Sequence, residues 1–383
     1  MAEAYIVAAA RTAGGRRGGR LMGWHPVDLA GAMLAEVAAR SGVDPAAIDD
    51  VIMGCVGQAG EQALHVGRNA VLASGLPASI PAVTIDRQCG SSQQAIQFAA
   101  QAVMSGTQDV VIAAGVEHMS RVPMGTSVAG AKPYSDRQLE RFGVRGFSQF
   151  TGAEMIAKKY GHSREALDAW SLESHRRAAA AVERGDFADE ILALDIETAD
   201  GPARHAQDEG IRFDASREGL GSLKTLVEGG VITAGNASQI CDGASGVMVV
   251  SETALKAHGL TPLARIHNLT VTAGDPVIML EEPLFATDRA LRRAGMRIDD
   301  IDLYEVNEAF APVPLAWLGH VGADPDKLNV NGGAIALGHP LGASGTKLMT
   351  TLVHALRKRG LRYGLQTMCE GGGIANVTIV EAL

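Results

Sequence analysis

One layout occurs twice in this sequence and limits the folds open to it. Residues 84–106 and 329–360 each run from a turn into an amphipathic helix, with apolar side chains at i, i+3 and i+4 spacing. Gly106 and Gly360 follow the predicted helices, as expected for residues that adopt the left-handed conformation beyond a helix end. Short apolar segments come next, "DVVIAAG" and "YGLQTMCEGGG", which are typical of buried strands. The sequence therefore predicts an α/β protein with two halves of similar layout.

A third region separates the two halves. Residues 118–245 are richer in charge and in turn residues than the flanking sequence, and they contain helical patterns such as "SREALDAWSLESHRRAAAAVERG". We interpret this region as a large insertion. With 383 residues, of which 46% are hydrophobic, the chain is long enough to bury the cores of two or three domains.

Cys89 lies between the apolar run 81–85 and the first of the two helices. Unpaired backbone N–H groups and the positive end of the helix dipole favour a thiolate over a thiol at such a position. The position therefore suits a nucleophile. The alternative is that Cys89 is a small buried apolar residue, which is the commoner role for a lone cysteine.

The overall charge disfavours two classes of partner. The net charge of −9 and the pI near 5.7 argue against a protein that binds nucleic acid or an anionic membrane over a broad surface. No apolar run approaches the roughly 18 residues of a membrane-spanning helix. The start of the sequence lacks the pattern of a signal peptide, and the C-terminal "VEAL" is not a peroxisomal address. We therefore expect a cytoplasmic protein without a membrane span.

Metal sites and nucleotide loops have no clear motif in this sequence. The four cysteines contain no C-x-x-C pair, and the eleven histidines show no H-E-x-x-H spacing, so no metal is expected. The Gly-rich "GHPLGASGTK" fails the P-loop pattern, because Lys347 follows Thr346 instead of preceding it. These glycines could instead bring backbone N–H groups close to a reacting oxygen, a role that requires polar catalytic neighbours.

Such neighbours occur at three further turns. His339 lies in "GHP", Asn307 in "YEVNEAF", and Cys369 in "MCEGGG". Each has a structural explanation on its own: a core histidine, a turn asparagine or a buried cysteine. Together with the Cys89 turn they resemble the thiolases, over motifs that run from "AYIVAAARTAGGR" through "QCGSSQQAI", "TAGNASQICDGAS", "NEAF" and "NGGAIALGHPLGASG" to "CEGGG". Separated motifs in this order are a specific signature of that family.

The resemblance implies a fold and its division into domains. Thiolases have a five-layered α/β/α/β/α fold of two similar halves with an inserted loop domain, in agreement with the layout described above. The expected N-terminal half comprises residues 1–117 and 246–262. The loop domain is expected at residues 118–245 and the C-terminal half at residues 263–383.

The resemblance also implies an activity. Thiolases catalyse the reversible cleavage of 3-ketoacyl-CoA by CoA, or the reverse Claisen condensation, through an acyl-cysteine. Cys89 would be the acylated nucleophile, His339 its base, and Cys369 the group that exchanges a proton with the incoming thiol or the acetyl α-carbon. Asn307, holding a water, would form one oxyanion site with His339, and the backbone N–H groups of Cys89 and Gly371 would form the other. A thiolate suits this chemistry because it both attacks and leaves readily.

For CoA, the resemblance points to Ser238 in the "GNAS" loop, next to the pantetheine, and to Arg212 in "DEGIRF", near the nucleotide. The alternative for Arg212 is a solvated surface charge. CoA and acyl-CoA are expected as substrates, with no additional cofactor. The expected assembly is a homodimer or a homotetramer.

Alternative functions differ in the residues that they require. A β-ketoacyl synthase would carry a second histidine in place of Asn307 and would lack a counterpart of Cys369. A non-catalytic acyl-CoA-binding homologue would be suspected if Cys89, His339 or Cys369 were missing, but all three are present. A biosynthetic acetyl-CoA acetyltransferase, which makes acetoacetyl-CoA, remains as the other branch of the family.

One local departure bears on the choice between degradative and biosynthetic thiolases. Short-chain biosynthetic members typically carry His-Met-Gly before a Thr-x-Ala-Glu step. Here that step, residues 151–154, follows Ser-Gln-Phe, which ends at Phe150. With Phe147 nearby, we expect a reshaped apolar acyl channel and a degradative enzyme that prefers medium-length or bulky 3-ketoacyl-CoA. The alternative is that both phenylalanines only pack the loop domain.

Overall fold

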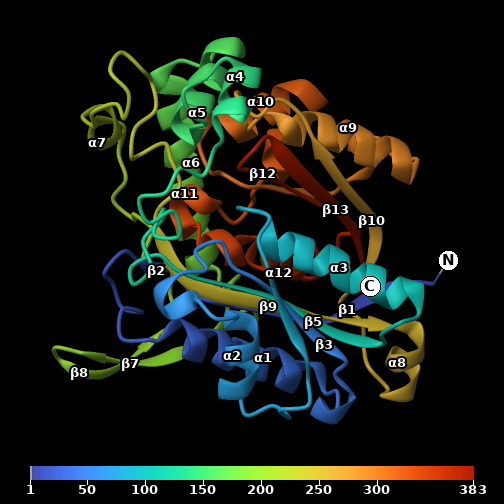
Figure 1. Ribbon diagram of the computed structural model, residues 1–383. Helices are drawn as coiled ribbons and strands as arrows, with labels where there is room; N and C mark the ends of the chain where they lie inside the picture. Colours follow the sequence, from blue (N-terminus) through green and yellow to red (C-terminus); the bar gives the residue numbers. More distant parts are fainter. Residues whose placement is uncertain (1) are drawn as a thin grey trace.

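The two predicted halves contribute strands to one eleven-stranded sheet in the computed structural model, which describes residues 2–383 (Figure 1). The main strand order is β11-β12-β13-β10-β1-β9-β5-β3-β4. The N-terminal half contains β1 (Ala4–Thr12), β2 (Gly15–Arg16), α1 (Pro26–Ser41), β3 (Asp50–Gly54), α2 (Val66–Ala73), β4 (Ala82–Ile85), α3 (Ser91–Ser105), β5 (Val110–His118) and β9 (Cys241–Ser251), followed by α8 (Glu252–Ala257). The C-terminal half contains β10 (Ala264–Ala273), α9 (Glu282–Ala294), β11 (Leu303–Val306), α10 (Pro312–Val321), α11 (Ala334–Leu337), α12 (Ser344–Arg359), β12 (Tyr363–Glu370) and β13 (Ile374–Ala382).

The predicted five layers are present. Helices α1 and α2 pack on the outer face of the N-terminal strands, and α9 covers β10 and β13 on the other side of the molecule. Helices α3 and α12 form the middle layer, in contact with strands of both halves (Figure 1). Three buried hydrophobic clusters fill the spaces between the layers. This arrangement confirms the α/β architecture of two similar halves.

The two halves repeat one topology down to a local irregularity. In each half the first strand pairs antiparallel with the last, which are β1 with β9 and β10 with β13. Both pairs contain a register shift, between Ile6 and Ala8 in β1 and between Ile266 and Asn268 in β10. An isolated parallel bridge between Tyr304 and Leu328 occupies the place that β4 has beside β3. The duplication predicted from the two helices therefore extends through the whole sheet.

The loop domain lies mainly on one side of this double unit (Figure 1). It contains α4 (Asp136–Phe142), α5 (Gln149–Lys159), α6 (Arg164–Glu183), β6 (Ile191–Leu192), β7 (Leu194–Thr198), β8 (Gly201–His205) and α7 (Arg217–Gly221). The predicted boundary between residues 245 and 246 falls inside β9. That strand pairs with β5 along its length from Asp242 to Val250, so its first residues already belong to the sheet of the N-terminal half.

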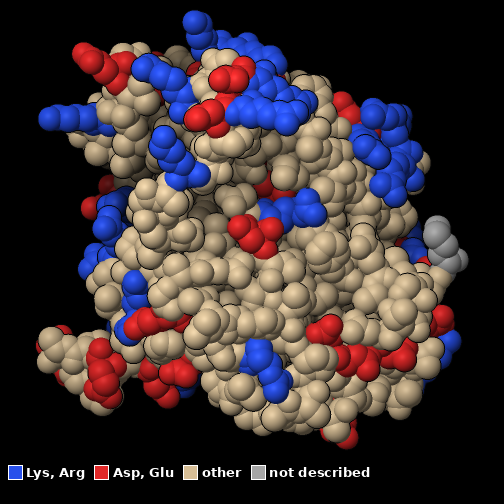
Figure 2. Space-filling model, in the orientation of Figure 1, with Lys and Arg blue, Asp and Glu red and all other residues tan. Residues whose placement is uncertain are grey.

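The surface carries charge of both signs. On the face drawn in Figure 2, most Lys and Arg side chains lie in the upper part, and the middle band is largely uncharged. Among residues 2–383, no helix combines the length and the apolar composition needed to cross a membrane.

Helices α3 and α12 cross closely near their first turns. A Cβ atom added at Gly345 of α12 would lie 2.0 Å from the backbone nitrogen of Gln93 in α3, so only glycine fits there. The backbone N–H of Thr346 donates to the hydroxyl of Ser92 at 3.0 Å across the same crossing. Both helices end as predicted, because Gly106 and Gly360 have positive φ angles of 76° and 63°. The crossing brings together the turns that precede the two helices.

Replacing Gly345→Ala is expected to destabilise the fold although alanine favours helix. The added methyl group would force the α3 backbone away, at a cost of about 1–3 kcal/mol or more in the free energy of unfolding. The control is Gly319→Ala in α10, where no atom lies within 4 Å of the added Cβ and a gain of up to about 1 kcal/mol is expected. Chemical denaturation of both variants measures the difference. Equal stability of the two would contradict a tight crossing.

Candidate active site

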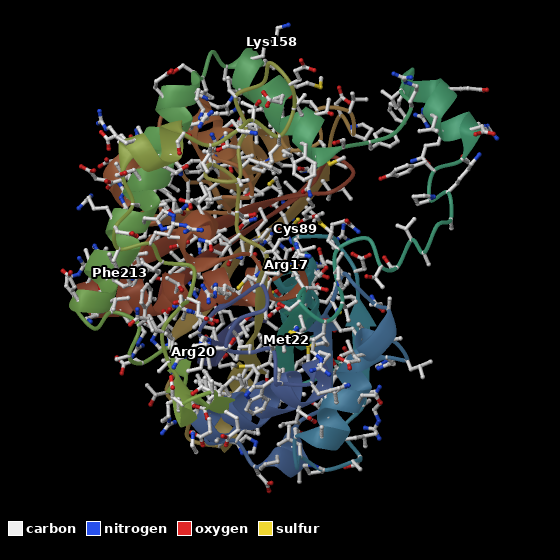
Figure 3. All side chains as sticks on the ribbon, turned by 90° about the vertical axis from the view of Figure 1, so that its left-hand side faces the viewer. Arg17, Arg20, Met22, Cys89, Lys158 and Phe213 are labelled. Carbon is white, nitrogen blue, oxygen red and sulfur yellow. The ribbon has the colours of Figure 1, made fainter. Side chains whose placement is uncertain are left out.

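Four loops meet where α3 and α12 begin. Cys89 lies in the turn before α3, and His339 lies between α11 and α12. Asn307 directly follows β11, and Cys369 is the next-to-last residue of β12. Figure 3 shows Cys89 near the centre of the molecule, between the two halves. Its side chain packs against Leu348 of α12 and against Met368, the neighbour of Cys369 in β12. The structure therefore brings together residues that are up to 280 positions apart in the sequence.

The Cys89 turn is tight and held from both sides. Gln88 adopts a left-handed conformation, with φ of 49°, which is uncommon for a residue with a side chain. The Asp86 carboxylate accepts a hydrogen bond from the Gln88 N–H at 2.6 Å. The Ser91 hydroxyl accepts from the Arg87 N–H at 2.9 Å and donates to the Gln88 carbonyl at 2.6 Å. These contacts orient Cys89 immediately before the helix.

Burial decides the protonation of Cys89. Its side chain is 9% exposed, and burial, with a smaller contribution from the nearby Glu370, raises the pKa of the Cys89 thiol to about 12. The expectation that the helix terminus favours a thiolate is therefore wrong for the free protein, because desolvation of the charged sulfur outweighs the helix dipole. The resting Cys89 is a thiol and needs a base.

The segment that contains Cys369 packs directly on the Cys89 turn. The two segments approach so closely that a Cβ at Gly90 would lie 2.0 Å from the Glu370 carboxylate, and a Cβ at Gly371 would lie 2.9 Å from the Gln88 side chain. Cys369 is fully buried. Burial, and to a smaller extent the neighbouring Cys89, raises the pKa of the Cys369 thiol well above its usual range. The backbone N–H groups of Cys89 and Gly371 are thus on adjacent segments.

The hydrogen bonds of His339 define its tautomer. The Asn307 side-chain N–H₂ donates to His339 Nε2 at 3.3 Å, so Nε2 is the unprotonated nitrogen. Nδ1 therefore carries the proton and donates it to the Ser344 hydroxyl, which in turn donates to the Pro340 carbonyl at 2.9 Å. Burial, assisted by the Lys347 ammonium, lowers the pKa of His339 to about 3. His339 is therefore a neutral imidazole whose Nε2 carries no proton and accepts a hydrogen bond from Asn307.

Asn307 has one side-chain atom that makes no hydrogen bond within residues 2–383. Its Oδ1 is buried and has no hydrogen-bond partner, although its amide nitrogen contacts His339. An acceptor in this position suits a water molecule that donates one hydrogen to Asn307 and the other to a substrate oxygen. The geometry is therefore compatible with the water expected on Asn307, whereas His339 Nε2, which carries no proton in this tautomer, can donate to an oxyanion only after it has taken up a proton.

Two buried carboxylates that sequence reasoning did not assign hold the loops in place. Glu308 accepts hydrogen bonds from Trp170 and Ser174 of α6, from Asn329, and from the backbone N–H of Ile335. Glu117, the penultimate residue of β5, accepts from the backbone N–H groups of Val56, Gly57 and Gly342. Both carboxylates follow apolar strand residues in the sequence, and that position is the signal that could have found them.

The comparison with known proteins agrees with this geometry along the whole chain. Residues 4–253 match the family described as thiolase, N-terminal domain, and residues 260–382 match the thiolase C-terminal domain. The chain belongs to the thiolase family. The identification made from the sequence motifs is therefore confirmed, and the β-ketoacyl synthase alternative is wrong.

Individual relatives cover this thiolase from end to end. The chain is 53% identical to the steroid 3-ketoacyl-CoA thiolase FadA6 of Mycobacterium tuberculosis, over 100% of this chain and 95% of the relative. It is 39% identical to the 3-ketoacyl-CoA thiolase of Bacillus subtilis over the full length of both. The crystal structure of human mitochondrial 3-ketoacyl-CoA thiolase superposes with a TM-score of 0.90 at 38% identity, over 100% of this chain and 99% of that chain. The acetyl-CoA acetyltransferase of Bacillus anthracis superposes with a TM-score of 0.92 at 37% identity, with the same coverage.

Residues of the loop domain line part of a cavity of about 570 Å³ and part of a second cavity of about 420 Å³. The second is lined by Arg212, Leu220 and Ala237, and Ala237 directly precedes Ser238. The Ser238 N–H donates to the Ala309 carbonyl at 2.9 Å, which ties this loop to the Asn307 segment. Of the two residues expected to contact CoA, Arg212 lines this cavity and is exposed, whereas Ser238 is not a lining residue although its neighbours Ala237 and Gln239 are.

Glu370 is an unusual group beside the two cysteines of this thiolase. Its side chain is fully buried, and within residues 2–383 neither carboxyl oxygen makes a hydrogen bond of standard geometry, although the nearby backbone N–H of Asn376 has a small lowering effect on its pKa. Burial raises its pKa to about 8, against the smaller opposing effect of Arg87. At neutral pH Glu370 is therefore protonated and adds no negative charge next to Cys89. Glu370 lies within the motif "CEGGG", and no sequence pattern predicted a role for it in the site.

Glu370→Gln is expected to stabilise the protein increasingly as the pH rises. In wild type the folded state keeps the proton up to about pH 8, whereas the unfolded carboxyl loses it near 4.5, so ionisation favours unfolding across this interval. Each pKa unit between the folded and the unfolded value corresponds to about 1.4 kcal/mol in the free energy of unfolding. The melting temperature of the variant relative to wild type should rise between about pH 4.5 and pH 8 and then level off.

The control for this measurement is Glu140→Gln, which alters an exposed glutamate of α4. It should give a difference from wild type that hardly changes over the same interval. A pH-independent effect of Glu370→Gln would show that Glu370 is ionised in the folded protein.

Proposed function

We propose that this thiolase cleaves 3-ketoacyl-CoA with CoA, to give acetyl-CoA and a shortened acyl-CoA, in a degradative direction. The observation that carries the proposal is that two neighbouring buried thiols, Cys89 and Cys369, lie beside α12, whose Leu348 packs against Cys89 and whose first turn is preceded by the neutral imidazole of His339. The printed names of the relatives from Mycobacterium tuberculosis and Bacillus subtilis, both 3-ketoacyl-CoA thiolases, support the same direction.

In the first half-reaction, the Cys89 thiol transfers its proton to His339 Nε2 and its sulfur attacks the 3-keto carbon. The developing oxyanion is stabilised by hydrogen-bond donors. The bond between C2 and C3 then breaks, and its electron pair forms the enolate of acetyl-CoA. Cys369 gives its proton to C2, so acetyl-CoA leaves and the acyl group remains on Cys89 as a thioester.

In the second half-reaction, CoA gives its thiol proton to the Cys369 thiolate. The CoA sulfur attacks the acyl-Cys89 carbonyl, and the Cys89 sulfur leaves and takes its proton back from His339. Both cysteines and His339 end in the states in which they began. CoA and acyl-CoA act as substrates, and the scheme uses no additional cofactor. The cavity beside Ser238 and Arg212 supports a CoA site at the edge of the loop domain.

Covalent trapping tests the assignment of the nucleophile. Incubation with an acyl-CoA in the absence of acceptor should give an acyl adduct on Cys89, mapped by mass spectrometry. Cys369→Ala should still acylate Cys89 but should lose steady-state turnover by a factor of about 10² or more, because the second proton-transfer group is gone. An adduct on Cys369 alone, or normal turnover of Cys369→Ala, would refute the assignment.

The acyl group is proposed to be of medium length or bulky. Phe150 is 37% exposed and lies edge-on to Phe310, with ring centroids 5.7 Å apart, three residues beyond Asn307. Phe147 instead packs against Tyr134 and Phe142, with ring centroids 5.1 and 5.7 Å apart. This aromatic cluster belongs to the segment that contains α4. Phe150 is therefore the apolar residue better placed for an acyl channel, while Phe147 packs the loop domain.

Substrate selectivity tests this part of the proposal. We expect kcat/KM for 3-ketooctanoyl-CoA to exceed that for acetoacetyl-CoA by about tenfold or more, since each buried methylene contributes about 0.8 kcal/mol. Phe150→Ala should reduce this ratio, whereas Phe147→Ala should leave it nearly unchanged in folded protein. A preference of about tenfold for acetoacetyl-CoA would move this thiolase to the biosynthetic branch, to which the name of the Bacillus anthracis neighbour belongs.

The assembly is proposed to be a homodimer or a homotetramer, in a reducing compartment such as the cytoplasm. Strand β4 lies at the edge of the sheet and, within residues 2–383, pairs only with β3; an open edge of this kind can pair with another chain. Apolar side chains are exposed beside it, with Leu64 at 90%, Leu72 at 56% and Val83 at 41%. Four free cysteines support the reducing compartment. A monomeric mass in analytical ultracentrifugation would refute the assembly.

A further inference from the structure

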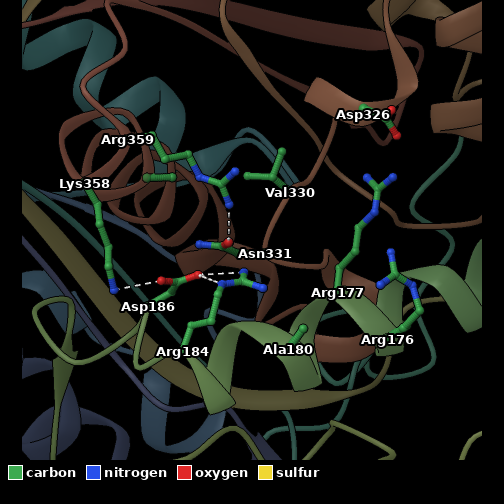
Figure 4. Close-up of a pocket in the computed structure, with 11 residues that line it drawn as sticks. Arg176, Arg177, Ala180, Arg184, Asp186, Asp326, Val330, Asn331, Lys358 and Arg359 are labelled. Carbon is green, nitrogen blue, oxygen red and sulfur yellow. Dashed lines mark hydrogen bonds and ion pairs between the residues drawn. The ribbon is translucent and has the colours of Figure 1, made fainter.

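A cavity of about 570 Å³ lies between α6 and α12, and five of its eleven lining residues are Lys or Arg (Figure 4). One wall carries Arg176, Arg177 and Arg184 of the α6 segment, and the other carries Lys358 and Arg359 at the end of α12. The protein as a whole has a net charge of −9, so this concentration of positive charge runs against its composition. We propose that the cavity binds a diphosphate group, either free pyrophosphate or the diphosphate of a nucleotide.

The carboxylates around the cavity do not balance its cations. Arg176 and Arg177 share one carboxylate, Glu173, which both contact at 2.6 Å. Arg184 and Lys358 share another, Asp186, with both contacts at 2.7 Å. Each of these two cation pairs therefore keeps an unneutralised positive charge.

Arg359 has no carboxylate at all among its contacts within residues 2–383. Its guanidinium donates to the amide oxygen of Asn331 at 3.2 Å, and Asn331 is only 2% exposed (Figure 4). A buried neutral side chain thus holds a cation at the cavity wall without cancelling its charge. Asp326, at the opposite side, forms no ion pair with the lining arginines within 4.0 Å in the described residues. The cavity therefore retains a positive potential.

Stabilisation of helix ends does not account for the cluster. Lys358 and Arg359 lie in the last turn of α12, where cations favourably meet the negative end of the helix dipole. Arg176 and Arg177 lie two turns before the end of α6, at Glu183, where this effect has faded. Arg359 also donates to Asn331, which belongs to another segment of the chain. The cations converge on the cavity from both walls.

The chemistry of the lining indicates a diphosphate. Guanidinium groups bind phosphate oxygens through paired hydrogen bonds, and cations on two facing walls suit an anion with oxygens at both ends. The lining contains no aromatic side chain on which a base could stack. The site therefore recognises the diphosphate group itself, whether or not a nucleoside is attached to it.

This cavity is separate from the one that contains Arg212. The Arg212 cavity is lined on α6 by His175, whereas the basic cavity is lined by Arg176, Arg177 and Ala180 on other positions around the same helix, and the two share no lining residue. The proposal consequently does not depend on where CoA binds.

Isothermal titration calorimetry tests the proposal on the full chain, with pyrophosphate in phosphate-free buffer of low ionic strength. We expect one site per chain, weakened about tenfold or more in the double variant Arg176→Gln/Arg359→Gln, because each charge-assisted contact contributes strongly. The control Arg292→Gln/Arg293→Gln removes the same charge from the last turn of α9 and should bind like wild type. Circular dichroism melting confirms that both variants are folded.

Titrations with ADP and with orthophosphate show whether the site prefers free pyrophosphate or a nucleotide, and whether it distinguishes a diphosphate from a single phosphate. Equal affinity for ADP and pyrophosphate, or tighter binding of ADP, supports the site and identifies which form it takes. Three outcomes would overturn the proposal: no pyrophosphate binding at millimolar concentration, an equal loss in the control variant, or equal affinity for orthophosphate. Because the readout is equilibrium binding, its result is independent of the proposed catalytic activity.

Discussion

The close crossing of α3 and α12 is the contact on which the rest of this thiolase depends. The two helices are equivalent elements of a duplicated unit, and they approach so closely at Gly345 that its position leaves no room for a side chain. Each helix is preceded by a turn with a reactive group, Cys89 before α3 and His339 before α12. Packing two equivalent helices at their first turns therefore places different chemistry from the two halves in one site.

The resting site is electrically neutral, and burial is the reason. Desolvation keeps Cys89 and Cys369 as thiols, His339 as an imidazole and Glu370 as a carboxylic acid at neutral pH. Burial raises the pKa of the Cys89 thiol and lowers the pKa of His339, so both groups are neutral in the free protein. In the proposed mechanism, a substrate oxygen and its hydrogen-bond donors share the charge that proton transfer creates.

The buried carboxylates show how such a site is held without charged groups at its centre. Glu308 and Glu117 accept several hydrogen bonds each and tie together loops from distant parts of the sequence. They act at the periphery, on the backbone that carries Asn307 and His339. Glu370, in contrast, has no side-chain hydrogen-bond partner within residues 2–383 and lies close to Cys89, where its raised pKa limits the negative charge beside the thiol.

The sequence alone determined the repeated layout, the two helices with their glycine ends, and the motif residues Cys89, His339, Asn307 and Cys369, because helical spacing and turn residues are local signals. Their catalytic roles remain predictions. Only the tertiary structure decided the protonation of Cys89, the tautomer of His339, the isolation of Glu370 and the different placements of Phe147 and Phe150. These properties depend on burial and on contacts such as Ser92 with Thr346, which are 254 residues apart, and no local pattern encodes what the folded chain places around a side chain.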